Sequence, residues 1–414
     1  MRTPRSGMSA ILGDPSCVAP VFQPVVEPTT GRTAGYEALA RWPGLPDISP
    51  LEAFDAARRS GSAATMDWWC RRRAVEGVHR RGPGSARHVF VNVEPDCISA
   101  PPPWGPTPTL TDPAGVETGI QVILELTERT LLQDPPAVVA GVEWARSLGF
   151  GIALDDVGAL PECLALLDVI APDVVKLDRS LTQMSAHGLE AARAISAAGD
   201  LARRRGSVIL AEGVETAEHA NCALSMGATL AQGYRYGRPG PLPERPAEAS
   251  PMRLVDHRRG RIRSLTDILD DAPSAVGDAR EAVEACALVE SMAASEHRAG
   301  CVVAMMHGAR HLSAEIAGRY RGLAGRHAFV GISAPGLGPS PRPGVRGPRS
   351  PELPDPGAFA VASIGADHAV AVIAAPRTPT DPRGAVRWCI TTDRDVVADT
   401  ARAVIGTLAP RSSP

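Results

Sequence analysis

The sequence predicts an α/β fold, with a (β/α)₈ TIM-like barrel over residues 15–245 and a smaller mixed α/β domain over residues 262–410. Three observations support this prediction. Eight short apolar runs occur in the first 240 residues or so, helical patterns lie between most of them, and this span matches the usual barrel size of about 250 residues. Periodicity alone leaves a doubly wound open sheet as the alternative.

Each expected barrel strand is a short apolar run. In chain order these runs are residues 19–26, 35–41, 88–93, 121–127, 151–156, 172–178, 207–213 and 227–234. The helical patterns between them include "SPLEAFDAARRSG", "PPAVVAGVEWARSLG" and "GLEAARAISAAGDLARRRG". Alternation of this kind favours parallel strands covered by helices.

A Pro-rich stretch, "GRPGPLPERPAEASP" at 237–251, predicts a domain boundary. We therefore expect an N-terminal tail at 1–14 and a linker at 246–261. The second domain should contain two helices, four strands and a long Pro/Gly/Arg-rich loop. These elements are the helices near 277–296 and 311–325, the strands 327–333, 359–365, 369–375 and 386–392, and the loop 335–356.

Composition excludes several classes of protein. The net charge of −3 comes without a basic stripe, which argues against a reader of duplex nucleic acid. No segment reaches the roughly 18 apolar residues of a membrane helix, and the first 20 residues lack the apolar core of a secretory signal. The eight cysteines are scattered without a C-x-x-C pair, so we expect reduced thiols in a cytoplasmic protein, with neither a disulfide frame nor a zinc site.

Polar side chains cluster at the carboxyl ends of the expected strands, which converge on one mouth in a (β/α)₈ barrel. They are Glu37, Arg41, Asn92, Glu125, Glu128, Asp155, Asp156, Lys176, Asp178, Glu212, Glu215 and Gln232. One such residue alone would be an ordinary loop residue, but here seven consecutive strands end in this way. Carboxylates packed this closely require cations, and oxygen ligands without a His or Cys cluster suit Mg²⁺ or Mn²⁺. Two such ions sharing a carboxylate of Asp155–Asp156 would form the usual clamp for hydrolysing a phosphodiester.

The strings "EALAR", "LELTE", "ALDDVG", "VVKLD", "AEGVET" and "QGYRYGRP" occur in this order between residues 37 and 239. Together they make residues 15–245 resemble the EAL family of cyclic di-GMP phosphodiesterases. The resemblance implies a metal-dependent enzyme that opens cyclic di-GMP to linear pGpG and forms a homodimer through this domain.

The resemblance also implies roles for individual residues. The expected metal ligands are Glu37, Asn92, Glu125, Asp155 and Asp156, with Asp155 bridging the two ions. Besides Glu37, the expected catalytic residues are Lys176, against the attacking water and the phosphate, Glu212, near the metal-bound water, and Glu128, which braces the loop after the fifth strand. Glu212 is a candidate general base, although a metal-bound hydroxide can act without one. The expected substrate contacts are Gln23, Leu39, Arg41, Asp178, Glu215 and Gln232, with Arg41 on a phosphate, where its bidentate geometry is well suited.

One feature of the sequence departs from the family pattern. Members of the family usually have the sequence D-D-F-G followed by a loop of the Thr-Gly-Tyr-Ser-Ser type, whereas this chain has "DDVGALPECLALL". This difference affects the loop expected to couple metal binding to dimer formation and regulation. The expected metal ligands are all present. Lys176 is the single lysine in the chain, and we expect its compact ammonium to fit where a guanidinium would crowd the site.

Within residues 262–410, the segments "HLSAEIAGRYRGLAGRHAFVGIS" and "WCITTDRDVVADTARAVI" resemble the DICT domain, a sensory module. No catalytic constellation is visible there, and we expect His307, His311 and His327 to be ordinary histidines, so this domain should regulate the barrel or bind a partner. The alternative to an enzyme is an inactive EAL-type receptor that binds cyclic di-GMP and signals through a partner. An interaction module with a vestigial pocket is a third reading. A complete ligand set favours the enzyme.

Overall fold

The computed structural model describes residues 8, 11–43, 45, 47–81, 86–94, 97, 98, 100–104, 120–184, 188–243, 252, 262–296, 300–377 and 385–411. The chain forms two compact units. The first comprises Met1–Glu128, Trp144–Ala159 and Pro172–Arg258, and the second Arg129–Glu143, Leu160–Ala171 and Arg259–Pro414. The predicted tail at 1–14 and linker at 246–261 fall largely outside the described residues, so these boundaries stay predictions.

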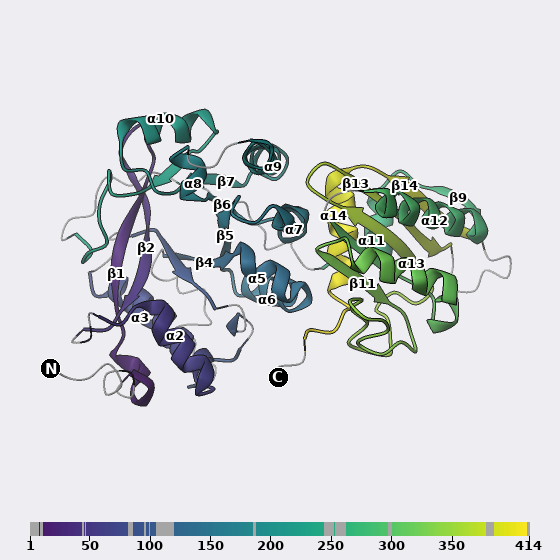
Figure 1. The fold of residues 1–414 in the computed structure, drawn as a ribbon, viewed down its shortest axis with the longest axis horizontal. Coiled ribbons are helices and arrows are strands. Elements are labelled where there is room, and N and C mark those ends of the chain that lie inside the picture. Colours follow the sequence, from purple (N-terminus) through teal and green to yellow (C-terminus); the bar gives the residue numbers. More distant parts are fainter. Residues whose placement is uncertain are drawn as a thin grey trace. The chain divides into compact units, whose positions relative to one another are not determined.

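Eight strands in the described part of the chain close into a barrel (Figure 1). They are β1 (Ala19–Val26), β2 (Thr33–Arg41), β3 (His88–Asn92), β4 (Gln121–Thr127), β5 (Gly151–Val157), β6 (Val174–Leu177), β7 (Val208–Ala211) and β8 (Leu230–Gln232). Each lies within or close to a predicted run, so the predicted barrel is confirmed and the open-sheet alternative is wrong.

One strand departs from the regular (β/α)₈ pattern. Strands β2 to β8 pair in parallel, but β1 runs antiparallel to both β2 and β8. The reason is the short connection between β1 and β2, where Gly31 at φ 72° helps to close a turn from Glu27 to Arg32. A parallel pair would need a crossover of about a dozen residues or more.

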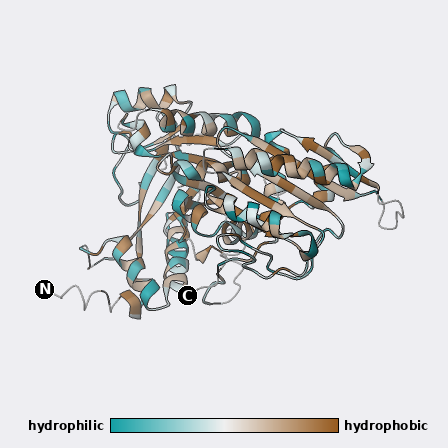
Figure 2. Ribbon diagram, turned by 45° about the vertical axis from the view of Figure 1, so that its right-hand side comes forward, coloured by the Kyte–Doolittle hydropathy of each residue, from teal (hydrophilic) through white to brown (hydrophobic). Residues whose placement is uncertain are grey.

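Some of the helices from residue 50 to residue 225 begin at a side-chain cap. They are α2 (Pro50–Arg59), α3 (Ala63–His79), α5 (Glu128–Gln133), α6 (Pro135–Ser147), α7 (Leu164–Ile170), α8 (Arg179–Thr182), α9 (Leu189–Arg205) and α10 (Ala217–Ser225). Helix α2 begins with a capping box between Ser49 and Glu52, and Thr216 caps α10. Many helices carry both brown and teal segments in Figure 2, as expected for elements with one face on a core and one in water. Every helix among the described residues is too short or too polar to span a lipid bilayer.

An apolar layer fills the barrel and contains one buried residue from each strand. Its members are Val25, Ala34, Phe90, Ile123, Ala153, Val174, Leu210 and Leu230. Because side chains two residues apart on a strand point to the same face, this layer determines which residues also face inward at the carboxyl ends.

The second unit contains a six-stranded sheet in the order β11-β10-β12-β13-β14-β9. Its elements are α11 (Leu265–Asp271), β9 (Ala275–Asp278), α12 (Ala279–Ser295), β10 (Cys301–Met305), α13 (Ala314–Ala324), β11 (Phe329–Ser333), β12 (Phe359–Ile364), β13 (Ala369–Pro376), β14 (Ala385–Thr391) and α14 (Arg394–Ile405). Residues of α12 and α13 share a core with Val302 of β10 and Val372 of β13.

The two predicted helices and four predicted strands of this domain are present. Strands β9 and β10 and helices α11 and α14 are absent from the predicted set. Strand β10 is a five-residue, fully buried apolar run, which periodicity alone does not distinguish from part of a helix. The eight cysteines are all free, as expected.

Candidate functional site

Six polar residues form a second layer directly above the apolar layer of the barrel. Each stands two positions after an apolar-layer residue on strands β3 to β8, so the strand pleat turns it toward the barrel axis. These residues are Asn92, Glu125, Asp155, Lys176, Glu212 and Gln232. Six of the predicted site positions thus come together by strand alternation alone.

Lys176 lies at the centre of this layer. Its Nζ lies 2.7 Å from Glu125 Oε1, 2.9 Å from Glu212 Oε1 and 3.0 Å from Asp155 Oδ1, with Glu37 Oε2 at 4.0 Å. The Lys176 side chain is 1% exposed. Burial acts to lower its pKa, but the surrounding carboxylates outweigh burial and raise it well above the usual value, so the ammonium remains charged.

The carboxylates around Lys176 differ in pKa because their partners differ. Burial raises the pKa of Glu125 well above its usual value, and repulsion from Glu37 and Asp155 adds to this effect. Burial likewise raises the pKa of Glu212 to about 8, against the attraction of Lys176. Glu37 is the exception: burial would raise its pKa, but Lys176 and two side-chain amides lower it overall. One ammonium therefore does not fully neutralise the cluster.

Glu37 is oriented by amide side chains from three other strands. Asn92 Nδ2 donates to Glu37 Oε1 at 2.9 Å, and Gln232 Nε2 donates to Glu37 Oε2 at 2.6 Å. Gln232 Nε2 also lies 3.2 Å from Gln23 Oε1, and Gln23 is the direct cross-strand partner of Glu37 in the β1–β2 pairing. The β1–β2 hairpin, which breaks the regular barrel pattern, thus places both Gln23 and Glu37 in the site.

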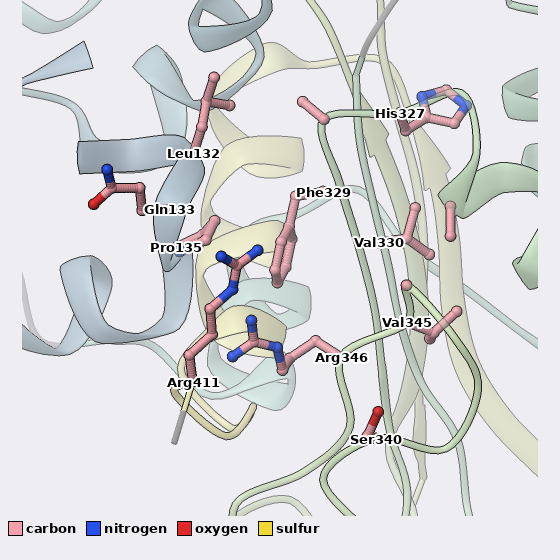
Figure 3. Close-up of a pocket in the computed structure, with 13 residues that line it drawn as sticks. Leu132, Gln133, Pro135, His327, Phe329, Val330, Ser340, Val345, Arg346 and Arg411 are labelled. Carbon is pink, nitrogen blue, oxygen red and sulfur yellow. The ribbon is translucent and has the colours of Figure 1, made fainter. Parts of the chain in front are cut away.

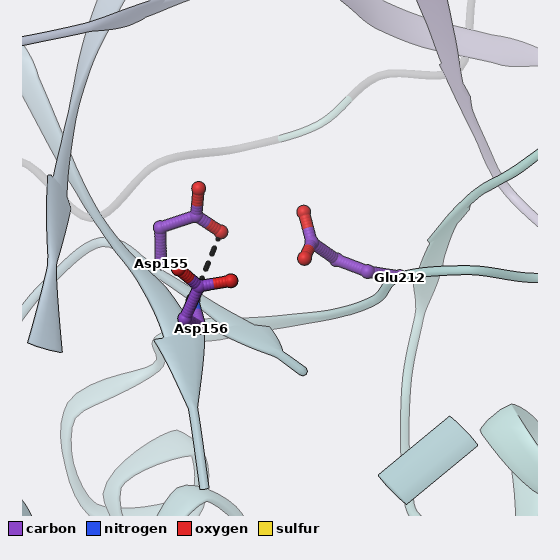
Figure 4. Close-up of side chains that lie close together, drawn as sticks. All are labelled: Asp155, Asp156 and Glu212. Carbon is purple, nitrogen blue, oxygen red and sulfur yellow. Dashed lines mark hydrogen bonds between the residues drawn. The ribbon is translucent and has the colours of Figure 1, made fainter. Parts of the chain in front are cut away.

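Asp155, Asp156 and Glu212 present carboxylate oxygens within 4.8 Å of one another (Figure 4). Asp156 has φ 59°, a left-handed conformation that is uncommon for a non-glycine residue, and its N–H donates to Asp155 Oδ1 at 3.0 Å. The β5–β6 register shifts at this point. Burial and the nearby Asp155 raise the pKa of Asp156 to about 6. An oxygen-only donor set with excess negative charge fits a hard divalent cation such as Mg²⁺ or Mn²⁺.

Glu128 lies beneath the loop that follows β5. Its buried Oε1 accepts a hydrogen bond from the Gly158 N–H at 3.1 Å. Gly158 has φ 104°, and a Cβ there would lie 2.6 Å from Leu181 Cδ1, so the loop requires glycine at this position. The contact between Glu128 and the loop agrees with the bracing role expected of it, which stays a prediction.

Among the described residues, four predicted substrate contacts form no hydrogen bond or ion pair with the polar layer. Leu39 is half-buried on β2, and the exposed Arg41 donates from Nη1 to the carbonyl of Ala40 at 2.8 Å. Asp178 caps α8 by accepting from the Ser180 N–H at 2.8 Å. Glu215 is exposed, and its N–H donates to His219 Nδ1 at 3.3 Å. Geometry therefore assigns these four residues no bond to the buried layer.

Two glycines beside the site were not predicted. Gly213 follows Glu212 with φ 64°, and a Cβ there would lie 2.5 Å from Arg179 Cβ. Gly233 follows Gln232, and a Cβ there would lie 2.1 Å from the Val214 carbonyl oxygen. The glycines lie in the strings "AEGVET" and "QGYRYGRP", each directly after a polar residue at the end of a strand. A glycine in this position is a sequence signal that another part of the chain packs closely against it.

The closed barrel with an acid-rich layer at its carboxyl end defines an α/β-barrel protein with a candidate cation site. The sequence comparison identifies the family: the EAL domain model matches residues 16–239, and the chain belongs to the EAL domain family.

Curated proteins and solved structures are similar to about half of this chain. Cyclic di-GMP phosphodiesterase PdeL of Escherichia coli is 30% identical over 227 residues, which are 54% of this chain and 62% of PdeL. The solved structure of the PaMucR phosphodiesterase in complex with c-di-GMP is 26% identical, covers 57% of this chain and 97% of its own, and has a TM-score of 0.47. The Klebsiella pneumoniae BlrP1 complex with manganese and cyclic di-GMP is 26% identical, covers 54% of this chain and 56% of its own, and has a TM-score of 0.47. The matched segment spans only 27%, 31% and 38% of the length of three further curated relatives.

Proposed function

We propose that this protein hydrolyses cyclic di-GMP to linear pGpG with two divalent cations, Mg²⁺ or Mn²⁺. The observation that carries the proposal is the buried cluster of Lys176 with Glu37, Glu125, Asp155 and Glu212 at the carboxyl end of an EAL barrel. The name of PdeL, a cyclic di-GMP phosphodiesterase, supports the substrate.

The charge balance of the cluster supports the binding of divalent cations. Five carboxylates, counting Asp156, face one ammonium, and burial or mutual repulsion raises the pKa of Glu125, Asp156 and Glu212. Ligands drawn from Glu37, Asn92, Glu125, Asp155 and Asp156 would hold the ions, with Asp155 between them. When bound, such ions supply an activated water and electrostatic stabilisation of the phosphodiester oxygens.

The chain's own side chains would then hold and orient the reactants. Lys176 presents a fixed positive charge toward the reacting phosphate, and Glu212, 2.9 Å from Lys176 Nζ, is positioned to accept a proton from water. Gln23 and Gln232 would contact the dinucleotide beside Glu37. Leu39, Arg41, Asp178 and Glu215 complete the proposed substrate contacts, with Arg41 turning from the Ala40 carbonyl to a phosphate. Glu128 would hold the loop after β5 in place.

Several further features belong to the same proposal. The second domain would be a DICT-like sensory module that regulates the barrel. The enzyme would act in the cytoplasm as a homodimer formed through the EAL domain. The divergent segment "DDVGALPE" would alter how dimer formation and regulation couple to the site, while every expected ligand residue is present.

The test is hydrolysis by the purified full chain with cyclic di-GMP and Mg²⁺ or Mn²⁺, followed by chromatography for pGpG. We expect turnover with metal, none with EDTA, and none in the Glu37→Gln variant. Glu190→Gln, an exposed position on α9 with a side chain 54% exposed, is the matched control and should keep full activity. Equal turnover in both variants would contradict the site assignment.

The same experiment separates the enzyme from a receptor. Binding of cyclic di-GMP without pGpG formation in either metal would support the receptor alternative. The intact set of expected ligands argues for the enzyme, because receptors built on this fold normally lack one or more of them.

A further inference from the structure

The second unit contains a cavity of about 240 Å³ (Figure 3). Its walls come from two parts of this unit. Leu132 and Pro135 belong to the segment 129–143, while Phe329, Arg346 and Arg411 belong to the C-terminal part. The proposed hydrolysis uses none of these residues.

Arg346 is the more buried of two arginines in this cavity, with a side chain 15% exposed. Its Nη1 lies 3.3 Å from Asp134 Oδ1 and donates to the Ala409 carbonyl at 2.9 Å. Burial lowers its pKa, the attraction of Asp134 opposes this, and repulsion from Arg411 lowers the pKa further. This repulsion indicates that the two guanidinium groups lie close enough to interact electrostatically.

Arg411 brings a second positive charge to the same space. Its backbone N–H donates to Asp134 Oδ2 at 2.6 Å, but within the described ranges its guanidinium has no hydrogen bond or ion pair. Figure 3 shows the Arg346 and Arg411 guanidinium groups beside each other and near Phe329. Among the described residues, Asp134 forms an ion pair with Arg346 and meets only the backbone of Arg411, so the two guanidinium groups leave the cavity with excess positive charge.

The remaining lining determines what kind of anion would fit. Leu132, Pro135 and Phe329 offer apolar contacts, and Ser340 offers a hydroxyl. His327 lines the cavity as well, but its ring nitrogens lie 3.2 Å from the Gly300 N–H and 3.0 Å from the Ala293 carbonyl, so both are already engaged. The lining therefore suits an anion better than a metal ion.

The size of the cavity limits the ligand. Since a water molecule occupies about 30 Å³ in the liquid, 240 Å³ corresponds to about eight waters. This is smaller than the usual drug-sized site of about 300 Å³ or more, and it matches a small acid or phosphate ester better than a cyclic dinucleotide.

We propose that this cavity binds a small organic anion whose carboxylate or phosphate group is held by both Arg346 and Arg411. Arginine is suited to this task because its planar N–H groups pair with two oxygens at once. The ligand's short carbon skeleton would lie against Phe329 and Pro135.

The test is isothermal titration calorimetry on the full chain with succinate, glycerol 3-phosphate and inorganic phosphate, at constant ionic strength and with EDTA to prevent metal-dependent binding in the barrel. We expect saturable binding of at least one probe, and the strongest probe distinguishes a carboxylate from a phosphate ligand. Arg411→Ala should weaken this binding about tenfold or more, since a hydrogen bond to a charged group is lost.

Arg321→Ala is the matched control, because Arg321 is an exposed arginine of α13 outside the cavity lining, and its loss changes the net charge equally. It should bind the probe as the wild type does. Three results would overturn the proposal: no saturable binding of any probe, unchanged affinity in Arg411→Ala, or an equal loss in both variants. Because Arg411 is exposed, its replacement should leave folding intact, and the circular dichroism spectrum verifies this. No step of the test depends on hydrolysis of cyclic di-GMP.

Discussion

The Lys176 ammonium lies 2.7 Å from Glu125 Oε1, and both side chains are almost entirely buried. A buried lysine on its own would lose its proton, because burial disfavours the charged form. Glu212 and Asp155, at 2.9 and 3.0 Å from Nζ, reverse this preference. The Lys176–Glu125 pair is thus part of one electrostatic unit.

Lys176→Arg should lower turnover about a hundredfold while leaving metal binding intact. The guanidinium is larger and planar, and in a space this closely surrounded it would displace carboxylates by distances that matter for catalysis. Chromatography for pGpG and calorimetry with Mn²⁺ measure the two effects. Arg203→Lys, at a side chain 73% exposed on α9, is the control. Wild-type turnover in Lys176→Arg would mean that the single lysine is an accident of codon usage.

Mg²⁺ or Mn²⁺ should raise the melting temperature of the barrel by several degrees. A ligand at 100 times its dissociation constant stabilises the folded state by about 2.7 kcal/mol. Asp155→Asn should abolish this shift, and Asp200→Asn, on the exposed side of α9, should retain it. Differential scanning calorimetry with and without EDTA provides the measurement. A shift of the same size in Asp155→Asn would remove Asp155 from the metal site.

Gly213→Ala should destabilise the protein by more than about 1 kcal/mol, because its φ of 64° disfavours a side chain and a Cβ would meet Arg179 Cβ at 2.5 Å. Gly227 separates these two causes. It has φ 82°, but a Cβ there would have its nearest neighbour at 4.0 Å. Urea denaturation should therefore show a larger loss for Gly213→Ala than for Gly227→Ala, and equal losses would mean that steric contact with Arg179 is unimportant.

Relative to the wild type, Asp173→Asn should gain stability as pH rises from acid to neutral, because the amide removes the pH dependence of the Asp173 carboxyl. Asp173 is buried, its Oδ2 accepts from the Ile152 N–H at 2.8 Å, and burial raises its pKa to about 6. Because the folded-state pKa lies above the unfolded one, the folded state favours the protonated carboxyl. Wild-type stability is therefore highest below the unfolded pKa and falls as pH rises toward 6.

The amide cannot ionise, so the advantage of Asp173→Asn should grow from about pH 4 to pH 6 and then stay constant. A shift of about two pKa units corresponds to about 3 kcal/mol at most. Urea unfolding followed by tryptophan fluorescence suits this test, since five of the six tryptophans precede residue 145. A variant advantage that does not change with pH would contradict the shifted pKa of Asp173.

Asp168→Ala should destabilise the second unit by about 3 kcal/mol, the lower end for breaking a buried ion pair. Arg394 Nε donates to Asp168 Oδ2 at 2.7 Å, and the carboxylate side chain is 5% exposed. Glu284→Ala breaks an ion pair in which both partners are mostly exposed, Arg280–Glu284, and should cost less than about 1 kcal/mol. Trp388 fluorescence during denaturation reports on this unit. Equal costs would mean that burial does not strengthen the Asp168 pair.

The fold and most of the buried layer follow from local sequence patterns. Apolar runs of strand length, such as "QVILELT", identify the strands, and the two-residue period of a strand turns Glu125 to the same face as Ile123. The same rule brings Asp155, Lys176 and Glu212 to the barrel axis. This rule does not predict strand β10, because a five-residue, fully buried run has no alternation of apolar and polar residues.

The sequence by itself thus determined the barrel, its polar layer and the identity of the charged residues, because these depend on local periodicity and residue type. Only the tertiary structure decided which charges meet. It reversed the direction of β1, placed Lys176 among four carboxylates, put Asp156 in a left-handed conformation and brought Arg346 beside Arg411. These relationships join residues that are distant in the chain or depend on a local backbone bend. Their energies depend on burial and on the distances between charges, and both are determined only when the chain folds.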